Sequence, residues 1–267
     1  MKVSSVIGLV VAIAGLYIGA VMEGSNPMAV LSPSAMSIVL GGTLGAVIIG
    51  TSFGAITNIP KMYMKAFSPP LIDLNAKVTE LVGYAEAARR DGLLALDEVT
   101  SNIEDPFTKK GLQLVVDGTD PDLVADILES ENDAMRKRHA AGVQPFDKAG
   151  GYAPTMGIIG TVFGLVHVLE NLSAPATLGP AISSAFIATL LGVASANVFY
   201  LPISSRLKQL TASEMHFREM TLEGILAIQA GDNPRVVQEK LVAYVPPSER
   251  LDPEQAAAAA SAEKAAA

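Results

Sequence analysis

The chain has 267 residues, half of them hydrophobic and 17% charged, and its mean hydropathy of +0.38 is too high for an ordinary soluble domain. The formal net charge is −8 and there is no basic stripe, which argues against a nucleic-acid partner. The absence of cysteine excludes disulfides, thiolate metal sites and a catalytic thiol.

Four uncharged stretches are long enough to cross a hydrocarbon core, which needs about 20 apolar residues. We expect spans at 3–22, 34–56, 150–169 and 181–204. Lys2 followed by an apolar run could also begin a cleaved signal peptide. No convincing small-residue cleavage site follows that run, so we interpret it as a span.

The basic residues predict the orientation. Of the 19 Lys and Arg, one is Lys2, eleven lie between the second and third spans, and seven follow the fourth. Since cytoplasmic loops carry the excess of Lys and Arg, both termini and the large insertion are expected in the cytoplasm. The expected organisation is spans one and two in 1–60, a cytoplasmic helical domain in 61–148, spans three and four in 149–205, a cytoplasmic helical extension in 206–250, and a disordered Ala-rich tail in 251–267.

The insertion is expected to be helical, which makes the fold class an all-α integral membrane protein. Apolar residues recur at helix spacing from Leu74 to Ala85, and Gly92 can end that helix. Asp120-Pro121 predicts a helix start, with the helix running towards His139. The run 112–116 has an ambiguous pattern and is interpreted as helix. After the fourth span no breaker appears before Gly224, so the fourth helix should extend far from the membrane.

None of the four expected spans contains Asp, Glu, Lys or Arg. Ionisable residues inside a membrane usually mark proton relays and ion paths. A chain that moves ions with these spans therefore needs a titrating group from a partner. His139, His167 and His216 have no metal-ligand spacing, and no enzyme motif is present, so we expect neither enzymatic activity nor a cofactor.

The spans do carry small and polar residues. Small residues let helices approach closely in lipid, either within the chain or against a second subunit. Those expected to pack against a partner helix are Gly157, Gly160, Gly164, Ala188 and Gly192.

Three hydroxyls could line an ion path: Thr155, Thr161 and Thr189. Thr161 follows Lys148 by 13 residues and Thr189 precedes Arg206 by 17, so both fall near mid-membrane at about 1.5 Å per residue. Pro154 and Pro202 lie at the cytoplasmic ends of their helices. Each proline could be a static kink, a helix start or a hinge that links the membrane to the cytoplasmic domain.

Five motifs in order resemble the A subunit of the bacterial flagellar stator, the MotA/PomA family within the MotA/TolQ/ExbB superfamily. The resemblance covers roughly residues 1–245. The motifs are ARRDGLLALDE at 88–98, YAPTMGIIGTVFGLV at 152–166, GPAISSAFIATLLGVASAN at 179–197, LPISSRLK at 201–208 and GDNPRVVQEKL at 231–241.

The resemblance implies a function. Such subunits form a ring of five around a dimer of a single-span MotB or PomB partner, which carries an intramembrane Asp and a peptidoglycan-binding domain. Ion flow past that Asp turns the ring in the inner membrane, and its cytoplasmic domain pushes on a rotor switch protein of the FliG type. The missing carboxylate in this chain fits that scheme.

The resemblance also assigns residues. Pro154 and Pro202 match the family's functional prolines, and Thr161 and Thr189 match hydroxyls near the ion site. The rotor contacts match Arg89 or Arg90 and Asp97 or Glu98. Sodium-type relatives tend to have two consecutive threonines in the fourth span, where this chain has Ala188 before Thr189. We therefore expect H⁺ as the coupling ion, with Na⁺ as the alternative.

Three other functions remain open. A TolQ/ExbB-type energiser resembles three-span proteins, so four spans and the late GDNP motif count against it. A self-contained transporter would be expected to show ionisable groups and internal repeats in its own spans. A passive scaffold would need neither prolines nor hydroxyls at matched depths.

Overall fold

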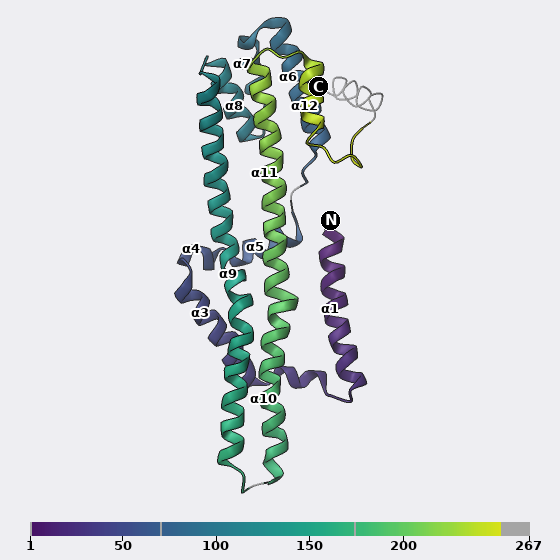
Figure 1. Ribbon diagram of the computed structural model, residues 1–267, viewed down its shortest axis with the longest axis vertical. Coiled ribbons are helices and arrows are strands. Elements are labelled where there is room, and N and C mark those ends of the chain that lie inside the picture. The colour runs from purple at the N-terminus through teal and green to yellow at the C-terminus, as the bar shows by residue number, and fades with distance from the viewer. Residues whose placement is uncertain (1, 70, 174, 252–267) are drawn as a thin grey trace. The chain divides into compact units, whose positions relative to one another are not determined.

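The structure, a computed structural model, describes residues 2–69, 71–173 and 175–251 (Figure 1). Within these ranges every regular element is a helix, which confirms the expected all-α fold. Two compact units divide the chain: Met1–Pro70 with Arg138–Leu210, and Leu71–Lys137 with Thr211–Ala267. In the described chain, four helical segments are long and apolar enough to cross a membrane.

The first unit begins with α1, in which no residue from Ser5 to Met22 is buried and most are exposed, as in a lipid-facing helix. Shorter elements follow it and form the second span and the helices after it. The bounds are α1 (Lys2–Met22), η1 (Pro27–Leu31), α2 (Pro33–Met36), a π-helical η2 (Ser37–Gly41), α3 (Gly42–Gly50), α4 (Phe53–Thr57) and α5 (Ile59–Phe67).

The second span ends at Gly50, so the expectation that it reaches 56 was wrong. Thr51 leaves the helical region with φ −131° and ψ 163°, and the Ser52 side chain then caps a new helix by accepting from Ala55 N at 3.4 Å. A carbonyl left open at the helix end is satisfied from a helix distant in sequence, because Lys148 Nζ donates to Gly50 O. This contact between distant residues has no signature in the local sequence.

The third span is part of α9 (Pro121–Glu170), a single helix of 50 residues. The helix starts at Pro121 as expected, with Asp120 Oδ1 accepting from Asp122 N at 3.0 Å. It does not stop near His139 but continues through the span. Pro154 therefore lies inside a helix and does not start one.

The fourth span extends without interruption, as expected, through α10 (Pro175–Ser195), the π-helical η4 (Ala196–Tyr200) and α11 (Leu201–Gln229). The wider turn of η4 immediately precedes Pro202. In regular α geometry a proline ring collides with the carbonyl four residues earlier, here that of Val198. The π turn gives that ring room without ending the helix.

The second unit packs short helices against parts of α9 and α11. Their bounds are α6 (Leu74–Asp91), η3 (Leu93–Ala95), α7 (Leu96–Thr100), α8 (Pro106–Val116) and α12 (Pro234–Val242). Run 112–116 is helical, as interpreted from the sequence. Gly92, at φ 86°, ends α6 in a conformation that favours glycine. The largest fully buried side chains of its core are Leu81, Leu96, Phe107, Leu112, Leu128, Met220, Ile225, Ile228 and Leu241.

One cation is buried in this second unit. Lys77 is 4% exposed, and its Nζ lies 2.9 Å from Glu80 Oε2 and 3.3 Å from Asp105 Oδ2. Asp105 also caps α8, accepting from Phe107 N and Thr108 N. Burial alone would raise the pKa of Asp105, but the Thr108 hydroxyl, the Lys77 charge and the Phe107 amide together hold it below its ordinary value. Lys77 thus balances the charge of a helix cap.

Candidate ion-path seam

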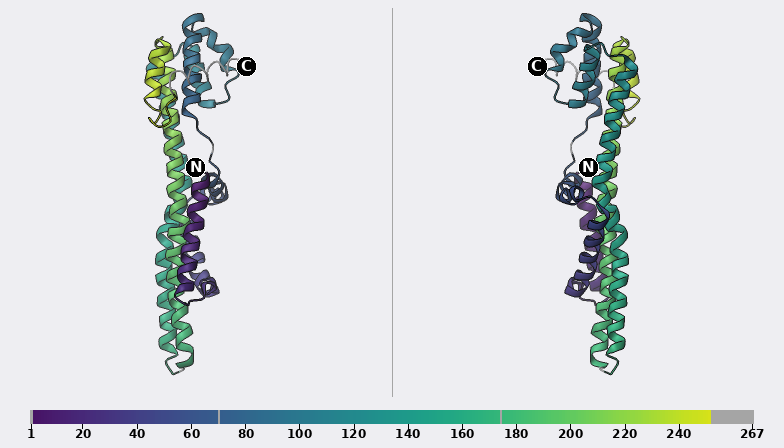
Figure 2. Two further views of the ribbon diagram at one scale, coloured as in Figure 1. Left: turned by 90° about the vertical axis from the view of Figure 1, so that its right-hand side faces the viewer. Right: turned by 90° about the vertical axis from the view of Figure 1, so that its left-hand side faces the viewer.

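Helices α9 and α10 approach closely through small residues on both sides (Figure 2). A Cβ added to Gly157 would lie 2.8 Å from Ala188 O, and one added to Gly160 would lie 2.7 Å from Ala188 Cβ. We call this contact the seam; it comprises Gly157, Gly160 and Gly164 of α9 with Ala185, Ala188 and Gly192 of α10. Such spacing lets backbones touch, which is how helices associate in lipid.

The seam accounts for the small residues by packing within one chain. Gly164 faces Ala185, with an added Cβ only 2.5 Å from Ala185 Cβ, and Gly192 faces Ala153 O. Contact of these residues with a partner helix therefore stays a prediction. Any such contact would have to use the surface of α9 and α10 that is not buried in the seam.

Two hydroxyls meet at the middle of the seam. The Thr161 and Thr189 hydroxyls are within hydrogen-bonding contact of each other. Thr161 Oγ1 also lies 3.1 Å from both Gly157 O and Ala185 O, and Thr189 Oγ1 lies 3.2 Å from Gly157 O. The matched depth expected from the sequence thus corresponds to a direct contact.

This group of four oxygens has a definite chemistry. Each hydroxyl has one proton, so the pair cannot fill every nearby acceptor at once, and alternative arrangements of the protons are available. Hydroxyl and carbonyl oxygens can pass a proton along hydrogen bonds or help to solvate a hard cation. Neither Thr161 nor Thr189 titrates in the physiological range, so a proton donor or acceptor must come from elsewhere.

The remaining membrane residues predicted from the sequence lie outside this group. Thr155 is exposed and its hydroxyl bonds its own helix at Tyr152 O, 2.8 Å away. Pro154 is half-buried inside α9, next to the seam at Ala153. Pro202 is exposed, beyond the seam, and follows the π turn.

A polar cluster that joins α9 to α11 was missed by the sequence analysis. Asp147 accepts from Ser204 Oγ at 2.5 Å and pairs with Lys208 Nζ at 2.7 Å. Burial alone would raise the pKa of Asp147, but the hydrogen bonds from Lys208 and Ser204 lower it below its ordinary value. A signal was present, since Asp147 precedes Pro154 by seven residues and Lys208 follows Pro202 by six. In antiparallel helices such positions lie at one level.

The four charged residues assigned to rotor contact surround the turn at Gly92 in the second unit. Arg89 and Arg90 end α6, Asp97 and Glu98 begin α7, and all four are exposed. Arg90 pairs with Asp91 at 2.8 Å, and its hydrogen bond holds the pKa of Asp91 below the ordinary value. Leu94 stands between the two charged pairs in sequence and is 77% exposed. The turn thus presents an apolar side chain between charges of both signs.

The helices and the seam define a class of protein, namely an all-helical membrane protein whose spans supply hydroxyls but no Asp, Glu, Lys or Arg. The comparisons give the family. The profile of the MotA/TolQ/ExbB proton channel family matches residues 99–220. Motility protein A of Bacillus subtilis is 36% identical over 252 residues, covering 94% of this chain and 93% of the relative. Chemotaxis protein PomA of Vibrio alginolyticus is 37% identical over 250 residues, covering 92% and 96%.

A solved structure agrees with these relatives. The flagellar MotAB stator complex from Bacillus subtilis contains a chain with a TM-score of 0.86 and 36% identity, covering 92% of this chain and 98% of that one. The chain therefore belongs to the MotA/TolQ/ExbB proton channel family. Membership of a channel family agrees with the expectation that it is not an enzyme.

Proposed function

We propose that this chain is the A subunit of a flagellar stator, which converts ion flow into torque together with a MotB/PomB-type partner. The observation that carries the proposal is the pair of hydroxyls, Thr161 and Thr189, in spans that contain no Asp, Glu, Lys or Arg. Such a seam can complete an ion path only when a partner supplies the carboxylate. The likeness to a chain of the MotAB stator complex supports the same division of labour.

In this proposal five copies surround two partner helices, and each partner helix carries an intramembrane Asp. The Asp takes up an ion on one side and releases it on the other, and the Thr161–Thr189 pair lies along its route. The coupling ion is H⁺, because Ala188 occupies the position of a second consecutive hydroxyl. A sodium ion needs several oxygen ligands to replace its water, whereas a proton needs one carboxylate and a hydrogen-bonded chain.

The turn around Gly92 would act on the rotor. Its exposed Leu94 with Arg89, Arg90, Asp97 and Glu98 around it has the composition of a docking patch, with an apolar centre and a charged rim. Charges of both signs steer a complementary rotor surface into register more than they add affinity. The rotor partner in this proposal is a switch protein of the FliG type.

The proposed placement is the inner membrane, with both termini and the second unit in the cytoplasm. It is supported by the distribution of Lys and Arg, which are absent from loops 23–33 and 170–180. A TolQ/ExbB-type energiser is the alternative from the same family. Four candidate spans and matches over more than nine-tenths of the chain to Motility protein A and PomA favour the stator.

The first test is affinity purification from gently solubilised native membranes, with mass spectrometry of the proteins retained. The expected result is a stoichiometric single-span protein with an intramembrane Asp and a peptidoglycan-binding domain. A chain that purifies alone, or with a partner lacking an intramembrane acid, would contradict the torque mechanism. Swimming speed with sodium replaced by potassium then decides the ion, and an unchanged speed is expected for H⁺.

A further inference from the structure

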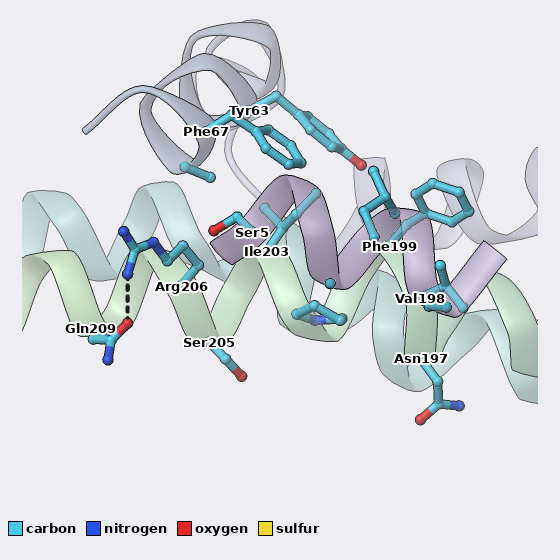
Figure 3. Close-up of a pocket in the computed structure, with 15 residues that line it drawn as sticks. Ser5, Tyr63, Phe67, Asn197, Val198, Phe199, Ile203, Ser205, Arg206 and Gln209 are labelled. Carbon is cyan, nitrogen blue, oxygen red and sulfur yellow. Dashed lines mark hydrogen bonds between the residues drawn. The ribbon is translucent and has the colours of Figure 1, made fainter. Parts of the chain in front are cut away.

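A groove of about 740 Å³ lies in the first unit where α1, α5 and the fourth span meet. Helix α1 contacts both α5 and η4. One wall is apolar and comes from Gly8, Leu9 and Ala12 of α1. The fourth span forms the floor, and aromatic side chains of α5 cover it (Figure 3).

The groove has two unlike ends. Figure 3 shows Arg206 and Gln209 at one end and Val198 with Phe199 at the other, with Tyr63 and Phe67 above. Positions 199 and 206 are seven residues apart on one continuous helical course, which corresponds to about 10 Å. An occupant that fits both ends must therefore have a polar head and an apolar tail.

At the polar end of the groove, part of the Arg206 guanidinium lacks a hydrogen-bond partner among the described residues. Its Nη1 donates to Gln209 Oε1 at 2.7 Å. Its Nε and Nη2 are shielded from solvent and have no hydrogen-bond partner among the described residues. None of the described residues that line the groove is acidic. A desolvated guanidinium without an anion is unfavourable, and its planar pair of donors suits a phosphate.

The depth of Arg206 indicates the source of that phosphate. Arg206 is the first charged residue after the uncharged run 171–205, so it stands where the hydrocarbon core ends and headgroups begin. Tyr63 at the same groove is an aromatic of the kind enriched at this boundary. The Phe199 end then lies deeper, at the level of acyl chains.

We propose that the groove binds one anionic phospholipid, whose phosphate pairs with the Arg206 guanidinium and whose acyl chain lies along Leu9, Ala12 and Phe199. Pro202 lines the same groove, so the bound lipid touches the turn that follows the π segment. This inference rests on the membrane placement of the chain and not on torque generation. A lipid result and a motility result can therefore fail separately.

Native mass spectrometry of the complex with its partner subunit, in nanodiscs of phosphatidylglycerol or phosphatidylcholine, tests the headgroup. We expect retained phosphatidylglycerol and no retained phosphatidylcholine. Arg206→Gln should lower phosphatidylglycerol retention at least about tenfold, the loss expected for one hydrogen bond to a charged group. Lys61→Gln, which removes an exposed cation from α5 outside the groove, should retain as much as the parent. Equal retention in Arg206→Gln and the parent would overturn the proposal.

A second pair of variants tests the tail. Ala12→Phe fills the apolar wall and should also abolish retention, whereas Ala14→Phe on the exposed side of the same helix should not. Since the chain has no Trp, Phe67→Trp adds a single fluorescent reporter to it. Its emission is obtained by subtracting the emission spectrum of the parent complex. Brominated phosphatidylglycerol should quench it and brominated phosphatidylcholine should not.

Two results of the quenching experiment would overturn the proposal in different ways. Millimolar inorganic phosphate could release phosphatidylglycerol and by itself protect the reporter from quenching by the brominated lipid. That result would make the site one for a free anion. Absence of quenching by either lipid in the assembled complex would mean that a neighbouring copy fills the groove.

Discussion

Asp147 and Lys208 form an ion pair of 2.7 Å that joins α9 to α11 just beyond the two prolines. Ser204, which is 1% exposed, donates to the same carboxylate. The pair holds α9 and α11 at one level next to the third and fourth spans. Asp147 also gives the buried Ser204 hydroxyl its hydrogen-bond acceptor. Losing that acceptor is costly, because a buried hydroxyl cannot bond to water instead.

Removing Asp147 should therefore matter through Ser204 more than through Lys208. We expect Asp147→Ala to lower the stability of the assembled complex by about 1 kcal/mol, the size of one lost hydrogen bond. Thermal unfolding followed by circular dichroism measures this. Arg136→Ala, which removes the exposed pair with Asp133 at 3.8 Å, should leave the midpoint unchanged. Equal shifts for both variants would contradict the role of Ser204.

Replacing Thr189 by valine should reduce ion flux without loss of the complex. The substitution keeps the shape but removes one of the two hydroxyls at the seam. Interhelical hydrogen bonds in membranes average about 0.6 kcal/mol, too little to prevent assembly. Proton flux into vesicles that contain the complex is the measurement.

Two controls sharpen this test. Thr189→Ser keeps the hydroxyl and should keep most of the flux. Thr155→Val removes a hydroxyl bonded only within its own helix turn and should have a smaller effect than Thr189→Val. Full flux in Thr189→Val would remove this hydroxyl from the ion path.

Adding one methyl group at Gly157 should disrupt the membrane unit. Its Cβ would lie 2.8 Å from Ala188 O and 3.0 Å from Thr189 Cα, and both are backbone atoms that no rotamer change can move. Overpacking of this kind destabilises by about 1–3 kcal/mol. Gly151→Ala is the matched control, since nothing lies within 4 Å of its added Cβ. The yield of monodisperse complex in size-exclusion chromatography should fall for the first variant only.

Replacing Lys77 by alanine should destabilise the second unit by about 3–5 kcal/mol, because it leaves the carboxylates of Asp105 and Glu80 without their buried cation. The folded state also lowers the pKa of Asp105 from its ordinary value of 3.8. A carboxyl with a lowered pKa stabilises the fold above that value, and its contribution is lost as the pH falls below it.

The pH dependence gives a second measurement on the same cluster. The thermal midpoint of the parent should fall as the pH is lowered through 4 and below, and Asp105→Asn should flatten that decline. A parallel decline in both proteins would mean that other carboxylates dominate acid unfolding.

Replacing Pro202 by alanine should leave assembly intact and abolish torque if the proline is a hinge. The substitution restores a backbone donor directly after the π turn, which favours a regular α-helix there. Swimming in soft agar and rotation of tethered cells measure torque, and purification of the complex measures assembly. Pro246→Ala, at an exposed position after α12, should swim like the parent. Full swimming in Pro202→Ala would reject the hinge.

Much of the membrane part follows from composition and spacing, because a span must be apolar for about 20 residues whatever it contacts. The helix end at Gly92 and the helix start at Asp120-Pro121 could also be predicted, because a cap acts on its own helix and is visible in the local sequence. Thr161 and Thr189 could be matched in depth because the nearest charges fix where each helix leaves the membrane.

What could not be predicted depends on contacts between distant residues. The second span ends at Gly50, where Lys148 of α9 supplies a donor. The buried position of Lys77 depends on Asp105, and Asp147 depends on Ser204 and Lys208. A local pattern records a charged residue in each case but not its partner. The small residues were recognised as packing material, yet their mates inside the chain became evident only from the structure.

The seam between α9 and α10 also limits where the membrane unit can bend. Its glycines and alanines have no side-chain rotamers, so the contact cannot adjust by repacking and has one close-packed arrangement. The two helices must therefore move as one rigid unit along the length of the seam. Bending at Pro154 would pull Ala153 O away from Gly192, whereas bending at Pro202 leaves every seam contact in place. Of the two prolines, only Pro202 can bend without breaking contacts of the seam.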